Sequence, residues 1–180
     1  MISNYLENVQ FEFRRYKTLG DKTFFQLSER ELHWQYQKTD NSIALIVKHM
    51  VGNMLSRWTD FLTEDGEKEW RNRESEFIAP PQSKRAIIEY WEKGWTCLFN
   101  ALKSIDETNF NTTIYIRGEA HTIIDAINRQ LAHYANHVGQ IVLLGKMIKG
   151  KDWCSPSIPK GESEDFNTVM RSKPSNRDFK

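Results

Sequence analysis

The sequence predicts an all-α fold with one short strand or hairpin before the last helix. Four long segments carry apolar residues that recur every three to four positions, the period of a helix with one buried face. Proline, glycine and capping residues separate these segments. The chain has 180 residues, which suits one domain with a single core. We expect that domain to span residues 1–168.

The first helix is expected from about Asn4 to Leu27, because apolar side chains recur along one face of this segment. They are Tyr5, Val9, Phe13 and Tyr16. Ser28 and Glu31 have the spacing of a capping box, which predicts a short extra helical turn. Residues 33–41 are expected to be extended.

The second helix is expected to begin at the capping residues 40–42 and to end before Asp65 and Gly66. Its apolar residues have nearly heptad spacing and are Ile43, Val47, Met50, Met54, Trp58 and Phe61. The charged stretch 64–76 follows. Its simplest interpretation is a solvated loop with internal ion pairs.

The third helix is expected to follow Pro81, with Ser83 as its cap, and to end near Asp106. Residues 112–118 alternate between polar and apolar, which predicts a short strand or hairpin. A fourth helix is then expected over residues 122–149, since Thr122 and Asp125 have capping-box spacing. Residues 151–168 are predicted to form an irregular C-terminal arm, and residues 169–180 a mobile tail.

Charge and hydropathy exclude several classes of function. Lysine and arginine total 25, aspartate and glutamate 24, so no overall field favours nucleic acid or an anionic membrane. The sequence contains no apolar run of about 18 residues, so no membrane span is expected. Two cysteines do not make a disulfide framework. We therefore expect a cytoplasmic protein that acts on a small-molecule substrate.

Two polar stripes interrupt the apolar pattern. His133 and His137 are four residues apart, so they project side by side from the fourth helix, next to its main apolar seam. His49 lies on a similar stripe of the second helix, followed at four-residue intervals by Asn53 and Arg57. Both stripes are expected to face the interior or its edge.

The histidine pair has two interpretations at this point. Imidazoles one helical turn apart can chelate a divalent ion, and a third histidine from a facing helix would leave coordination positions open for chemistry. A hydrogen-bonded pair of core histidines would show the same spacing. His33 lies in an extended segment and His121 precedes a helix cap, so neither is an expected ligand.

Four stretches resemble the DinB/YfiT-like superfamily, in particular a bacterial branch of unknown function. They are KHMVGNMLSRWTDFL (48–62), DGEKEWRNRESEF (65–77), YIRGEAHTIIDAINRQLAHYANHVGQIV (115–142) and SIPKGESEDFN (157–167). The resemblance implies an up-down-down-up four-helix bundle, commonly a homodimer. It also implies a divalent ion such as zinc, nickel or iron, held by His49, His133 and His137.

The resemblance implies an activity less directly than a site. Some members of the superfamily are metal-dependent S-transferases that use mycothiol, bacillithiol or glutathione, and others are maleylpyruvate isomerases. The leading hypothesis is therefore a transferase that activates a bacillithiol-type low-molecular-weight thiol. A metallohydrolase remains open because a bound metal can also activate water. A non-enzymatic protein that binds a metal or a small ligand is the third hypothesis.

Five further side chains are candidates for supporting roles. Asn53, Gln130 and Gln140 lie one turn from the expected ligands and could orient them. Arg57 and Arg117 could anchor carboxylates of a thiol cofactor, because guanidinium binds carboxylate bidentately. The alternative for these arginines is an internal ion pair with an acidic residue. The acidic candidates are Glu74, Glu76 and Glu119.

Overall fold

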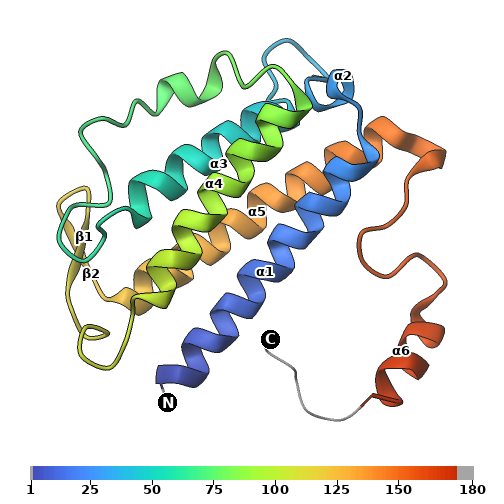
Figure 1. The fold of residues 1–180 in the computed structure, drawn as a ribbon. Coiled ribbons are helices and arrows are strands. Elements are labelled where there is room, and N and C mark those ends of the chain that lie inside the picture. The colour runs from blue at the N-terminus through green and yellow to red at the C-terminus, as the bar shows by residue number, and fades with distance from the viewer. Residues whose placement is uncertain (1, 174–180) are drawn as a thin grey trace.

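The structure is a computed structural model that describes residues 2–173. Within that range it is mostly helical, with six α-helices and one small two-stranded hairpin (Figure 1). The predicted all-α class with a hairpin before the last long helix is confirmed to this extent.

Four long helices lie side by side and share one core (Figure 1). They are α1 (Ile2–Gln26), α3 (Ile43–Trp58), α4 (Lys84–Lys103) and α5 (Ile123–Lys149). Helix α3 packs on α4 and α1 packs on α5, while contacts of α3 with α5 and of α1 with α4 join the two pairs. The largest fully buried side chains include Trp91, Trp95, Tyr134 and Phe13, so aromatic packing fills the centre.

Shorter elements connect the long helices. They are α2 (Glu29–Leu32), the 3-10 helix η1 (Glu74–Phe77), β1 (Ile114–Ile116), β2 (Glu119–His121), the 3-10 helix η2 (Gly150–Asp152) and α6 (Ser163–Arg171). Both predicted capping boxes are confirmed, Ser28 with Glu31 before α2 and Thr122 with Asp125 before α5. Each satisfies backbone N–H groups at a helix start and so fixes where the helix begins.

The hairpin turn positions one of the candidate arginines. Strands β1 and β2 pair antiparallel, and Arg117 and Gly118 form the two-residue connection with φ angles of 59° and 74°. Positive φ at both central residues suits the twist of a tight hairpin. The carboxylate of Asp65 accepts hydrogen bonds from the backbone N–H groups of Arg117 (2.8 Å) and Gly118 (2.7 Å). The turn is thereby tied to the segment that follows α3.

Two boundaries differ from the predictions. Helix α3 ends at Trp58, earlier than the expected end before Asp65, because Asp60 has a φ of 47°, which an α-helix cannot include. The arm expected to be irregular over residues 151–168 contains η2 and the start of α6. Residues 174–180 of the predicted mobile tail lie outside the described residues, and mobility of the tail stays a prediction.

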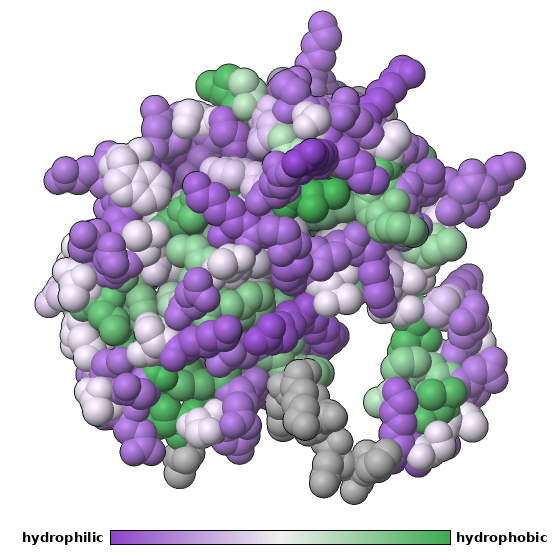
Figure 2. Space-filling view, viewed as in Figure 1, coloured by the Kyte–Doolittle hydropathy of each residue, from purple (hydrophilic) through white to green (hydrophobic). Residues whose placement is uncertain are grey.

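The C-terminal arm first docks and then leaves the body of the molecule. The side-chain amide of Gln26 accepts from the backbone N–H of Cys154 and donates to its carbonyl, both at 2.9 Å. Beyond this anchor, α6 stands off the long helices with exposed apolar side chains (Figures 1 and 2). These exposed side chains are Phe166, Val169 and Met170.

Within residues 2–173, no helix combines the length and the apolar character needed to cross a membrane.

Candidate metal centre

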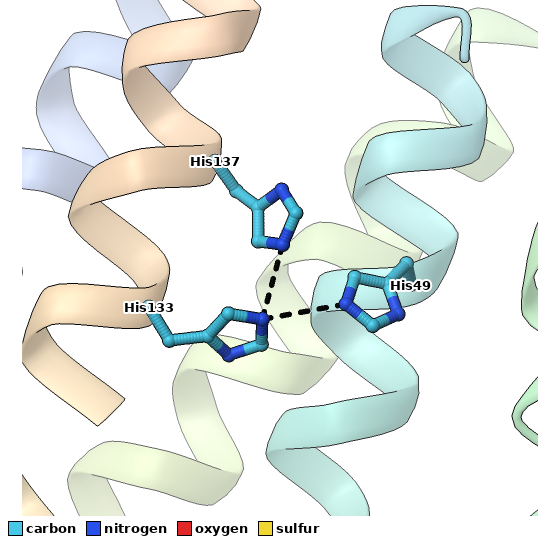
Figure 3. A group of neighbouring side chains, drawn as sticks. All are labelled: His49, His133 and His137. Atoms are coloured by element: carbon cyan, nitrogen blue, oxygen red, sulfur yellow. Dashed lines mark hydrogen bonds between the residues drawn. The ribbon is translucent and has the colours of Figure 1, made fainter. Parts of the chain in front are cut away.

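Three histidines from two helices meet at one point between α3 and α5 (Figure 3). The Nε2 atom of His133 lies 3.3 Å from Nε2 of His49 and 3.0 Å from Nε2 of His137. One nitrogen from each ring lies within 4.8 Å of the other two. The predicted stripes therefore face each other, and this group could hold a metal ion.

In each of the three rings, the Nδ1 atom faces a side-chain oxygen. The Nδ1 atom of His49 lies 2.8 Å from a Glu76 carboxylate oxygen. The Nδ1 atoms of His133 and His137 lie 3.4 Å and 3.3 Å from the side-chain carbonyl oxygens of Gln130 and Gln140. An acceptor at Nδ1 places the proton of a neutral imidazole there and leaves the Nε2 lone pair free.

The resulting donor set fits a first-row divalent ion. Three Nε2 lone pairs that point at one another repel unless a cation or a shared proton lies between them. Burial, followed by the neighbouring His137 and His49, lowers the pKa of His133 to about 3. Burial and His49 also lower the pKa of His137. His133 and His137 are therefore neutral at pH 7, which is the form that coordinates metals.

Glu76 is the residue that holds the His49 ring. Its carboxylate accepts from His49 and also from the guanidinium of Arg71, whose Nε lies 2.8 Å from Glu76 Oε1. The ring of Phe77 stacks on His49 at 4.9 Å between centroids. A carboxylate that accepts from the outer nitrogen of a histidine fixes its orientation and raises its basicity, as in many metal sites.

Burial does not leave Glu76 neutral. Desolvation opposes ionisation of its carboxyl group, but the hydrogen bonds from His49 and Arg71 outweigh that cost and lower its pKa. The side chains of Glu76 and Arg71 are 7 % and 2 % exposed. The interpretation of residues 64–76 as a solvated loop is therefore wrong for this pair, although the stretch is rich in ion pairs as expected.

Sequence reasoning missed the roles of Glu76, Arg71 and Phe77. The available signal was weak, an aromatic residue at the end of a charged run. Asn53 lines the same cavity as His49 and His133, and its side-chain oxygen accepts from the hydroxyl of Tyr134 at 2.9 Å. Tyr134 is fully buried and belongs to the core.

The two candidate arginines share one acidic partner. Arg57 and Arg117 lie 3.0 Å and 3.2 Å from the same oxygen of Glu67. An internal ion pair was one interpretation of these arginines, but the expected partners Glu74, Glu76 and Glu119 were wrong. The reason is that the hairpin turn and the segment after α3 meet through Asp65, which brings Glu67 between the two guanidinium groups.

A cavity of about 250 Å³ adjoins the histidines. It is lined by His49, Asn53, Arg57, Arg71, Arg73, Arg117, Arg129, Gln130 and His133. The cavity thus opens directly onto two of the three converging rings, so a small molecule bound there would reach the candidate metal position.

The remaining histidines lie away from the group, as predicted. The Nε2 atom of His33 lies 2.8 Å from the carbonyl oxygen of Gln82. His121 lies beside Glu119, with 3.5 Å between Nε2 and the carboxylate. Among the described residues, neither is part of the histidine group.

Replacing Gly52 by alanine is expected to weaken metal binding. A Cβ atom at this position would lie 2.5 Å from Glu76 Oε1 and 2.8 Å from its Cδ, so the carboxylate that holds His49 must move. Loss of such a supporting contact costs about 10- to 100-fold in metal affinity. Competition with a chromophoric chelator measures the change.

A matched control is Gly139→Ala on α5. A Cβ atom there meets no described atom within 4 Å. This variant should bind metal as the wild type does and gain up to about 1 kcal/mol of stability from helix propensity. Equal metal affinity in both glycine variants would contradict the role given to Glu76.

These features define a class: a mostly helical protein with a buried three-histidine group that could hold a metal ion. The model of family DUF1572, described as a protein of unknown function, matches residues 1–162. The chain belongs to this family. Comparison with curated proteins and with solved structures gave no significant match.

Proposed function

We propose that the chain is a DinB-like four-helix bundle that binds one divalent ion through His49, His133 and His137. The observation that carries this proposal is the convergence of three Nε2 atoms, each on a ring whose Nδ1 faces an oxygen. Zinc, nickel and iron(II) all accept such an imidazole set. The up-down-down-up topology is supported by Figure 1, in which α1 and α5 run one way and α3 and α4 the other.

We further propose that the protein is an S-transferase that uses a bacillithiol-type low-molecular-weight thiol. A divalent ion at the histidines would supply the charge that favours thiolate over thiol at neutral pH. Arg57 and Arg117 would bind carboxylates of the thiol cofactor, while Glu76 holds the His49 ring in place. In the transfer, a carbon–sulfur bond forms, the bond from carbon to its leaving group breaks, and the thiol proton passes to solvent.

Hydrolysis fits the site less well than thiol transfer. A metallohydrolase of the usual kind places a carboxylate or histidine base beside the attacking water. Glu76 faces the Nδ1 side of His49 and is held by Arg71, and Glu67 is held by three arginines. Both carboxylates therefore serve as ion-pair partners.

A homodimeric state and a cytoplasmic location stay predictions.

The proposal is tested with tag-free protein in two steps. Elemental analysis and thermal-shift screening with zinc, nickel and iron(II) should reveal one bound ion that raises the melting temperature. Conjugation of monobromobimane or chlorodinitrobenzene is then followed with bacillithiol, mycothiol or glutathione. We expect turnover that depends on both metal and thiol.

Two results would count against the proposed function. If the wild-type protein bound no stoichiometric zinc, nickel or iron(II), the proposals of a metal centre and of a transferase would both be wrong. Thiol-independent turnover of ester or amide substrates by the metal-loaded protein would favour a hydrolase instead.

A further inference from the structure

The cavity beside the histidines has an unusual concentration of positive charge. Of the nine described residues that line it, five are arginines. They come from four parts of the fold: Arg57 from α3, Arg71 and Arg73 from the segment before η1 and its cap, Arg117 from the hairpin turn, and Arg129 from α5. Since the whole chain carries a formal charge of only +1, this charge is a local feature.

Internal carboxylates compensate only part of this charge. Glu67 contacts Arg57, Arg71 and Arg117 through one and the same oxygen. Glu76 is shared between Arg71 and His49. Arg73 contacts Glu74, a side chain that is 85 % exposed. The five arginines thus share three carboxylates, of which one is strongly exposed, and this leaves an excess of positive charge at the cavity.

The Nε atom of Arg57 is buried without a hydrogen-bond partner among the described residues. The residue as a whole is 7 % exposed. Its other contacts are with Glu67 and the carbonyl oxygen of Gly66. A buried N–H of a charged group without an acceptor costs free energy. Arg57 is one of the residues that line the cavity, so an anion bound there would add a partner for this guanidinium group.

The surrounding charges reinforce this point. Burial lowers the pKa of Arg57, and the nearby charges of Arg71 and Arg117 lower it further against the opposing effect of Glu67. An anion in the cavity would relieve this repulsion. Arg129 adds a solvent-exposed charge to the cavity lining and lies one helical turn before His133 on α5.

We propose that this cavity binds a small organic molecule with two anionic charges, either a dicarboxylate or a phosphate monoester. Arg57, Arg117 and Arg129 bind the anionic groups, and the rest of the molecule points toward His49 and His133. The orientation of the ligand toward the histidines rests on the proposed function, because it assumes that a metal ion is bound there. The anion site itself is built from protein groups alone.

Glu67 is the internal competitor of this ligand. Its oxygen occupies the position between three guanidinium groups where an anionic oxygen of a ligand would gain most. Glu67→Gln keeps an acceptor oxygen and removes the charge. We expect this variant to bind dianions several-fold more tightly than the wild type.

The test is calorimetric titration of metal-free, full-length protein at low ionic strength. Succinate and inorganic phosphate represent the two dianion sources, and acetate is the monoanion. We expect saturable binding of at least one dianion, with acetate at least about tenfold weaker. Arg129→Gln should weaken dianion binding about tenfold, as loss of one charge-assisted hydrogen bond predicts. Tighter binding of succinate or of phosphate identifies the source.

A matched control removes the same charge elsewhere. Arg85 on α4 has an 87 % exposed side chain and pairs with Glu89, so Arg85→Gln should leave dianion binding unchanged. Equal losses in the Arg85 and Arg129 variants, or no dianion binding by wild type, would overturn the inference. Dianion binding without stoichiometric metal would remove the proposed metal centre and leave the anion site. Metal binding without dianion binding would leave the metal centre and remove both the anion site and the cofactor-binding role given to Arg57 and Arg117.

Discussion

Replacing His133 by alanine is expected to abolish stoichiometric binding of a divalent transition metal. The Nε2 atom of His133 lies within 3.3 Å of the corresponding atoms of His49 and His137, so this ring is the central one of the three. The metal dissociation constant should rise by more than about a hundredfold, since even residues that only support ligands cost 10- to 100-fold. Elemental analysis after dialysis measures the occupancy.

The same variant should lose stabilisation by metal. A ligand at about 100 times its dissociation constant adds about 2.7 kcal/mol to the stability of the folded state. We expect zinc or nickel to raise the melting temperature of the wild type and to leave His133→Ala unchanged. His33→Ala is the matched control, because His33 contacts the carbonyl of Gln82 and lies outside the group. A His133→Ala protein that retains one tightly bound ion would disprove the assignment.

Replacing Glu76 by alanine is expected to be the most destabilising change at the site. It would leave the guanidinium of Arg71, with a side chain only 2 % exposed, without its main partner. Removing one member of a buried ion pair costs about 3–5 kcal/mol. Urea denaturation of the metal-free protein measures the loss, and the metal affinity of the variant should fall as well, since His49 loses its acceptor.

Two further variants separate this effect from a general loss of charge. Glu74→Gln changes an 85 % exposed carboxylate two residues away and should cost less than about 1 kcal/mol. The double variant Arg71→Met with Glu76→Leu removes both buried charges and should recover much of the stability lost by Glu76→Ala. If Glu74→Gln and Glu76→Ala were equally stable, the buried ion pair would have no special role.

Glu76 also gives the stability a dependence on pH. Its pKa is lower in the folded protein than the value of about 4.3 expected in the unfolded chain. The stabilisation from its ionised form is therefore fully present above that unfolded value, and it is lost as the pH falls through the lower folded value. The wild type should thus lose more stability between neutral and acidic pH than Glu76→Ala.

Much of the fold and the histidine group could be predicted because both depend on regular spacing. The capping boxes at Ser28 and Thr122 and the alternation in residues 112–118 are local signals, and local structure follows them. The histidines lie on helical stripes, so helix geometry alone brings His133 beside His137. That His49 joins this pair was expected only from the resemblance to the DinB/YfiT-like superfamily, because the spacing of residues within one helix does not say which other helix they face.

The supporting residues were harder to predict because they depend on how a nonhelical segment folds back. Residues 59–83 have no repeating pattern, so the periodicity of the sequence does not indicate that Glu76 and Phe77 lie against α3. The same holds for the arginine-lined cavity. Arg57 and Arg117 were candidates because of their positions near motifs, whereas Arg71, Arg73 and Arg129 join them only through the tertiary fold.

The two helices that supply the histidines come from distant parts of the chain, and this separation orders the assembly of the centre. His49 and His133 are 84 positions apart, while Glu76 follows His49 by 27. Because a ribosome makes the chain from its N-terminus, His49 and its carboxylate partner leave the exit tunnel well before α5 does. Metal capture by all three rings therefore has to wait until α5 has been made, and before that point His49 is the only member of the group in the chain.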